Sequence, residues 1–120
     1  MASGVWVTAV LALVCFASSP TEARELKTFS GIAAFYGKGY AGRTACGQRY
    51  DPGKFTAAHR TLPFGTHLRV TDVATHRSVT VTVNDRGPFT KGRVLDLSLA
   101  AAQALRMQDR GLIKVTAAVE

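Results

Sequence analysis

An acidic residue follows the segment with the clearest strand pattern in the sequence. Valines alternate with serine, threonine and asparagine over residues 78–84, which predicts a β-strand with one buried face. Asp85 continues the valine parity, so its carboxyl group is expected at the rim of a barrel, partly shielded from water, where it could exchange protons with a substrate. The run from Asn84 to Pro88 also suits a turn in which the aspartate bonds its own backbone, and both interpretations stay open.

A second arrangement of reactive residues is Cys46, His59 and Asp85, which occur in the order of an exported cysteine peptidase that cuts wall peptides. A thiolate nucleophile is often found at a helix N-terminus, and the residues after Cys46 carry no helical pattern, which counts against this alternative. None of the three histidines has a partner at metal-ligand spacing, so no metal site is expected. Glycine patterns for phosphate or dinucleotide binding lack the required helix, so no cofactor is expected.

The N-terminal segment predicts export. Twelve of the thirteen residues from Val5 to Ala17 are hydrophobic, a run too short to span a bilayer but suited to a signal peptide, with a cleavage site after Ala23. We therefore expect a signal peptide over 1–23, no transmembrane span and a periplasmic location. Cys15 lies inside the run behind the bulky Val14, so lipid anchoring through Cys15 is not expected.

Charge narrows the class of partner. The 120-residue chain has 15 Lys and Arg against 8 Asp and Glu, a formal net charge of +7, which favours polyanionic partners such as cell-wall polymers. The cations are scattered singly along the chain rather than gathered in a stripe, and export would separate the protein from nucleic acid, so no nucleic-acid partner is expected.

Periodicity predicts one mainly β domain over 28–119. Short strands are expected over 28–36, 55–59, 67–72, 78–84, 94–97 and 112–119, with one helix from a Ser98 cap to about Met107. Many short strands with one small helix favour a closed β-barrel over a parallel sheet. Phe35, Phe55 and Phe89 are expected in the core.

Five segments, read together, resemble the rare lipoprotein A family of bacterial lytic transglycosylases. The resemblance runs in collinear order through GIAAFYG (31–37), GRTACGQRYD (42–51), TAAHRTLPFGT (56–66), VNDRGPF (83–89) and RVLDLS (93–98). It implies a six-stranded double-psi β-barrel, the fold also used by expansins. It further implies cleavage of peptidoglycan glycan strands between N-acetylmuramic acid and N-acetylglucosamine, with a 1,6-anhydro product and a preference for strands without stem peptides.

The resemblance also implies roles for individual residues. Asp85 matches the family's active-site aspartate and would act as the acid and base, while His59 matches the active-site histidine and would orient or tune it. Tyr36 and Tyr40 flank a glycine-rich loop and are expected to stack on sugar rings. Arg43 and Arg86 are expected to bind the lactyl carboxylate of muramic acid.

One position departs from the family. Where members carry a glutamate after a glycine, this chain has Gln48, and a carboxamide can hydrogen-bond a sugar but cannot donate a proton as an acid. Gln48 is therefore expected to position the sugar. Two outcomes stay open: Asp85 works alone, or the domain is a non-catalytic, expansin-like glycan binder.

Overall fold

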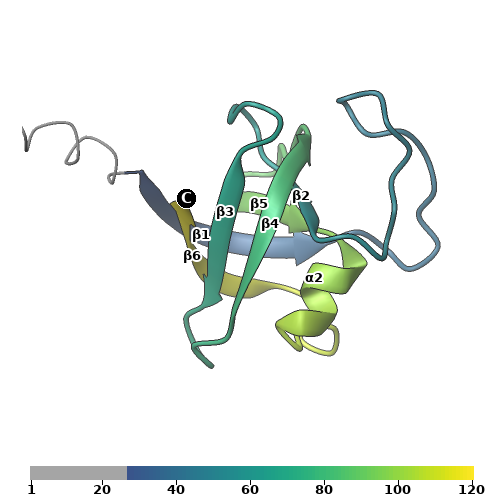
Figure 1. The fold of residues 1–120 in the computed structure, drawn as a ribbon. Helices are drawn as coiled ribbons and strands as arrows, with labels where there is room; N and C mark the ends of the chain where they lie inside the picture. The colour runs from purple at the N-terminus through teal and green to yellow at the C-terminus, as the bar shows by residue number, and fades with distance from the viewer. Residues whose placement is uncertain (1–26) are drawn as a thin grey trace, which may run out of the picture.

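This computed structural model describes residues 27–120. Six strands lie within this part of the chain. The expected signal peptide, its cleavage site and Cys15 lie outside the described residues. The strands close into a barrel in the order β1-β5-β2-β4-β3-β6 (Figure 1). Their bounds are β1 Thr28–Phe35, β2 Thr56–Ala58, β3 His67–Asp72, β4 Ser78–Asp85, β5 Arg93–Leu97 and β6 Ile113–Val119. The expected mainly β fold, a closed six-stranded barrel with one short helix, is confirmed.

In the barrel, only β3 and β4 among the described strands are both consecutive in the chain and paired with each other. The chain turns back at residues 73–77 to form the β3–β4 hairpin, in which Leu68 pairs with Val81, as the alternation predicts. By contrast, β1 runs parallel to β5 and β2 runs parallel to β4, and parallel pairs need long connections. The C-terminal ends of β1 and β4 lie near each other, since Tyr36, the residue after β1, bonds Asp85, the last residue of β4.

The barrel interior is filled by the apolar face of each strand. Leu68, Val83, Leu95 and Val115 come from four different strands, and none of these side chains is accessible to solvent. The expected core position of two phenylalanines is wrong, because Phe55 is 49% exposed and Phe89 is 77% exposed. Both lie in connections outside the strands, where no alternating pattern turns a side chain inward.

The helix α2, Leu99–Ala104, covers one end of the core. As expected, Ser98 caps it, since the Ser98 side chain accepts a hydrogen bond from the Ala101 amide. The helix ends before Met107 because Arg106 adopts a positive φ of 55° and the Met107 amide bonds back to the Ala102 carbonyl, which is a Schellman ending. No helix within residues 27–120 has the length and apolar character needed to cross a membrane.

Candidate functional site

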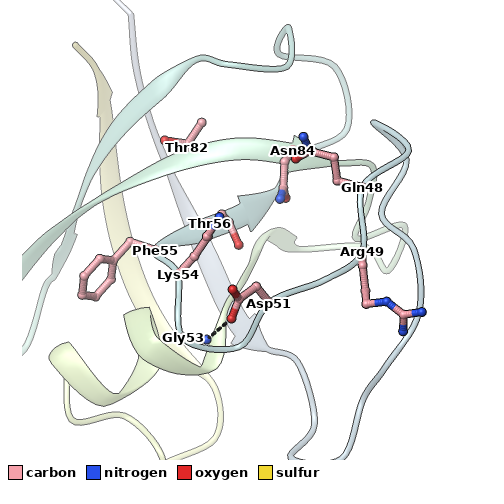
Figure 2. A pocket seen from close by; sticks show the side chains of 9 residues that line it. All are labelled: Gln48, Arg49, Asp51, Gly53, Lys54, Phe55, Thr56, Thr82 and Asn84. Carbon is pink, nitrogen blue, oxygen red and sulfur yellow. Dashed lines mark hydrogen bonds between the residues drawn. The ribbon is translucent and has the colours of Figure 1, made fainter.

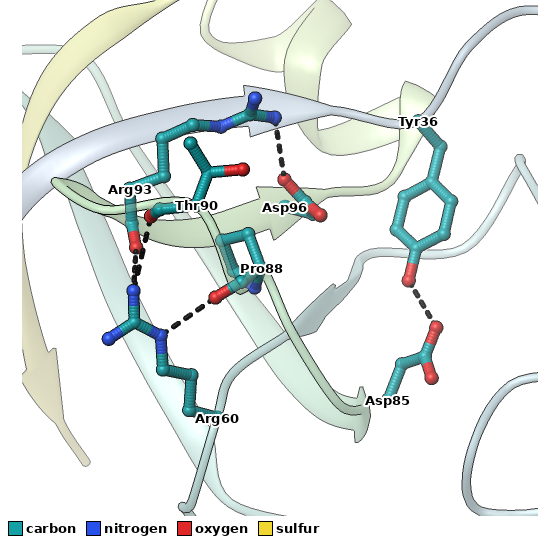
Figure 3. Close-up of polar contacts among 7 residues, drawn as sticks. All are labelled: Tyr36, Arg60, Asp85, Pro88, Thr90, Arg93 and Asp96. Carbon is teal, nitrogen blue, oxygen red and sulfur yellow. Dashed lines mark hydrogen bonds and ion pairs between the residues drawn. The ribbon is translucent and has the colours of Figure 1, made fainter.

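Asp85 is the last residue of β4 and is half-buried. Its Oδ1 accepts hydrogen bonds from the Ala45 amide at 2.7 Å and from the Arg86 amide at 2.9 Å. Its Oδ2 accepts a hydrogen bond from the Tyr36 hydroxyl at 2.5 Å (Figure 3). The carboxyl group therefore makes the local backbone bond of a turn aspartate, but two donors from distant parts of the chain also hold it.

Tyr36, the residue after β1, bonds the Asp85 carboxyl group through its hydroxyl, and an aromatic cluster holds its ring. Its ring stacks on Tyr50 with centroids 4.5 Å apart, and Tyr40 packs against it at 5.1 Å. Burial, and then the hydrogen bond to Asp85, raise the pKa of the Tyr36 hydroxyl, so the phenol stays a donor at neutral pH. Its predicted role of stacking on sugar is untested. The exposed Tyr40 presents more free ring surface for that role.

A small hairpin over residues 42–50 supplies the Ala45 amide. Thr44 donates its amide to the Gln48 carbonyl at 2.8 Å, and Gly47 at the tip has a φ of 99°, which favours glycine. The tip docks on the end of β4, where the Cys46 amide bonds to the Asn84 carbonyl at 3.2 Å. The hairpin and β4 together therefore fix the Asp85 carboxyl group.

Gln48 lines an open cavity of about 530 Å³ beside the end of β4 (Figure 2). Asn84, one residue before Asp85, is part of the cavity wall. The wall as a whole offers amides, hydroxyl groups, an aromatic ring and two cations. The lining residues are Gln48, Arg49, Asp51, Gly53, Lys54, Phe55, Thr56, Thr82 and Asn84. Asp51 bonds the Gly53 amide, as a turn aspartate does. Such walls can hydrogen-bond and stack on a carbohydrate.

Among the described residues, the His59 side chain makes no hydrogen bond to the Asp85 carboxyl group, and its expected role of orienting or tuning Asp85 stays a prediction. Its Nδ1 accepts hydrogen bonds from the Thr61 and Leu62 amides, each at 3.1 Å, and its ring packs edge-on against Phe29. Burial, and then the nearby Arg86 and Arg60, lower the pKa of the imidazole, which favours the neutral ring. The connection to Asp85 runs through the backbone, from the His59 amide to the Asp85 carbonyl at 3.1 Å.

The two arginines expected to meet a substrate carboxylate have partners within the protein. Arg86 donates to the Leu62 carbonyl at 2.8 Å, and its guanidinium lies 4.0 Å from the centre of the Phe64 ring. Arg43 donates to the Gly47 carbonyl at 3.0 Å. Arg86 therefore braces the connection after β2 and Arg43 braces the hairpin, and their roles in substrate binding stay predictions.

Cys46 and His59 are held by different neighbours, so the structure does not bring the peptidase residues into a catalytic chain. The Cys46 thiol lies 3.3 Å from the Thr44 hydroxyl, which lowers the pKa of the thiol, whereas the His59 ring packs on Phe29. Among residues 27–120, no three His, Cys, Asp or Glu side chains gather in a way that would hold a metal ion.

Asp96 is a carboxyl-bearing residue near Asp85 to which the sequence analysis gave no role. It lies on β5 and bonds Arg93 at 3.3 Å, while Arg60 fixes the preceding segment by donating to the Pro88, Thr90 and Arg93 carbonyls (Figure 3). Burial, opposed by Arg93 and assisted by the charge of Asp85, raises the pKa of Asp96. The signal in the sequence that could have indicated Asp96 is its position between two leucines of one strand, both of which are buried.

Comparison with known proteins identifies the family to which the chain belongs. The family described as "Lytic transglycolase" matches residues 28–117. A "Probable endolytic peptidoglycan transglycosylase RlpA" from Nostoc sp. is 57% identical over 91 residues, which cover 73% of this chain and 24% of the relative. The chain spans about a quarter to a third of the length of the first curated relatives it matches.

Solved structures agree on the fold. The Streptomyces papain inhibitor superposes with a TM-score of 0.64 at 24% identity, covering 80% of this chain and 96% of the inhibitor. An expansin from Clavibacter michiganensis superposes with a TM-score of 0.61 at 26% identity, covering 78% of this chain and 50% of the expansin. Proteins of different function thus share the barrel.

Proposed function

Because the chain belongs to the RlpA-like family of lytic transglycosylases, we propose that it cleaves peptidoglycan glycan strands between N-acetylmuramic acid and N-acetylglucosamine. The proposed product is a 1,6-anhydro end, the preferred substrate is glycan without stem peptides, and the proposed place of action is the periplasm. The observation that carries the proposal is a half-buried carboxyl group that is held by three donors and directly follows Asn84, a residue in the wall of a polar cavity.

The reaction requires a group that handles protons at two oxygens. The bond between the muramoyl anomeric carbon and the glycosidic oxygen breaks, and that oxygen takes up a proton. The muramoyl 6-hydroxyl loses a proton and closes on the anomeric carbon, so no water is consumed. Asp85 suits this exchange because hydrogen bonds fix the orientation of its carboxyl group and because the preceding residue, Asn84, lines the open cavity.

The cavity beside Asp85 is the proposed place for the sugar chain. Gln48 and Asn84 offer amide groups, and Phe55 offers an exposed ring on which a pyranose can stack. Lys54 adds a cation for the lactyl carboxylate, a part that the sequence assigned to Arg43 and Arg86.

The decisive test is incubation of the protein with naked glycan strands, followed by mass spectrometry. Asp85→Asn keeps the shape of the side chain but removes its acid, so we expect a loss of anhydro-ended fragments of about 10²- to 10⁴-fold. Asp109→Asn, which neutralises an exposed carboxylate in the connection before β6, serves as the matched control and should keep full turnover. Equal turnover in both variants would refute the assignment of Asp85.

Glycan binding without cleavage is the second candidate function. Gln48 in place of an acid and the structural likeness to an expansin favour it. It predicts that intact glycan retains the wild-type protein and that no anhydro ends form over long incubation. Cut stem peptides that disappear with Cys46→Ser would instead point to the peptidase.

A further inference from the structure

Two carboxyl-bearing residues flank the same alanine in the barrel wall. Ala58 on β2 pairs with Asp85 on β4 at one side and with Asp96 on β5 at the other. Because neighbouring strands lie about 4.8 Å apart, the two aspartate backbones are separated by roughly 10 Å. Figure 3 shows the Asp96 carboxyl group on the side of β5 that faces Tyr36, whose hydroxyl bonds Asp85.

The two carboxyl groups have different surroundings. Both oxygens of Asp85 accept hydrogen bonds, three in all, whereas Asp96 makes its side-chain bond through one oxygen, to Arg93. The titratable and charged groups near Asp96 are Arg93 from its own strand, Asp85 from β4 and Tyr36 from the end of β1. The strand between the two aspartates contributes only Thr56, Ala57 and Ala58.

These different surroundings suit Asp96 to the role of acid and Asp85 to the role of base. Burial, opposed by Arg93 and assisted by the charge of Asp85, raises the pKa of Asp96, while three donors bond the two oxygens of Asp85. Pairs of titratable groups whose environments differ in this sense supply the acid and the base of many active sites. Gln48 cannot hold an acidic proton, so a division of the acid and base roles between two carboxyl groups requires a residue other than Gln48.

We propose that Asp96 is the second carboxyl group of the site and supplies the proton that Gln48 cannot. The inference rests on the proposed function. Asp96 gives its proton to the glycosidic oxygen as the bond to the anomeric carbon breaks, and Asp85 takes the proton of the muramoyl 6-hydroxyl as the new ring closes. One proton is given and one is taken, and its return from Asp85 to Asp96 through solvent restores the starting state.

Carboxyl ¹³C NMR titration tests the pairing without any turnover. In the wild-type protein Asp96 should titrate above the ordinary aspartate range of about 3.9. Asp85→Asn removes the neighbouring negative charge and should lower the Asp96 titration midpoint, and Arg93→Met removes the cation and should raise it. An Asp96 midpoint that does not move in Asp85→Asn would overturn the pairing, and this measurement needs no substitution at Asp96.

Turnover of naked glycan tests the role in catalysis. Asp96→Asn should reduce the release of anhydro ends by about 10²- to 10⁴-fold with unchanged circular dichroism, while Asp109→Asn keeps the wild-type rate. A general acid works only while protonated, so turnover should fall as pH rises through the Asp96 midpoint, and Arg93→Met should move this alkaline limb to higher pH. A purely structural ion pair would leave the limb in place.

The possible failures are separable. If the wild-type protein forms anhydro ends and Asp96→Asn does so within threefold of it, only the role of Asp96 is overturned. If the wild-type protein forms none, the proposed function and the proton-donor role fall together, and the NMR titration still decides whether the two carboxyl groups are paired.

Discussion

Tyr36 joins residues 49 positions apart by donating its hydroxyl hydrogen to Asp85. The bond fixes one oxygen of the carboxyl group, and the stack on the buried Tyr50 fixes the phenol. Among the described residues, Tyr36 and not His59 makes a side-chain hydrogen bond to this carboxyl group. Tyr36 is therefore a positioning residue whose removal should affect turnover more than stability.

Tyr36→Phe should lower turnover of naked glycan by roughly 10- to 100-fold, because hydrogen bonds to charged groups contribute about 1.5–3 kcal/mol. The ring stack is kept, so the urea midpoint should change little. Tyr40→Phe, which removes the hydroxyl group of the exposed tyrosine in the same cluster, is the matched control. If both variants lose turnover equally, the effect arises from the cluster rather than from the bond to Asp85.

At the scale of elements, the start of α2 connects the aromatic cluster around Tyr50 to strand β2. The buried Ser98 hydroxyl accepts hydrogen bonds from the Ala101 amide in the helix and from the Thr56 amide at the start of β2. The next residue, Leu99, donates its amide to the Tyr50 hydroxyl at 3.0 Å. The helix start therefore ties the aromatic cluster to the strand that separates Asp85 from Asp96.

Ser98→Ala should lower the free energy of unfolding by about 1–3 kcal/mol, because it removes a helix cap and leaves the Thr56 amide without this partner. Urea unfolding followed by circular dichroism measures the change. Gln103→Ala, at an exposed position of the same helix, should stay within about 0.5 kcal/mol of the wild-type protein. A loss of equal size in both variants would contradict the bridging role of Ser98.

The elements were more predictable from sequence than the site. Alternation defines β3 and β4 because each strand buries one face, and the Ser98 signal places the start of the helix. The hairpin over residues 42–50 has no such pattern, because its contacts are with Asn84 and Asp85, far along the chain. The same holds for Asp96, whose relation to Asp85 exists only once β2 lies between their strands.

At the scale of the whole molecule, an ion pair fastens the seam between β3 and β6 in the barrel. The carboxylate of Asp72, 1% exposed at the end of β3, accepts hydrogen bonds from Ala74, Thr75 and Arg110, and Arg110 lies just before β6. Burial alone would raise the pKa of Asp72, but the bonds from Arg110, Ala74 and Thr75 outweigh it and hold the pKa below its usual range. The seam between β3 and β6 is thus tied at this end.

This depressed pKa predicts loss of stability in acid. The contribution of Asp72 is complete above its unfolded pKa of about 3.9 and is lost as pH falls through the lower folded value. Asp72→Asn should cost about 1–3 kcal/mol at pH 7 and reduce the fall in urea midpoint between pH 5 and pH 2. Asp109→Asn should keep the wild-type fall, and an unchanged acid profile in Asp72→Asn would contradict the role of the seam.

The hairpin beside β4 is closed by the main chain of residue 48, whose carbonyl accepts from both the amide and the hydroxyl of Thr44. Its side chain lines the cavity, and the Cys46 thiol of the same hairpin lies 4.0 Å from its Oε1. The two bonds from Thr44 use only the carbonyl of residue 48, so an acid at this position would keep both of them. Exchange of this one side chain can therefore alter the proposed chemistry while both bonds to the carbonyl of residue 48 are kept.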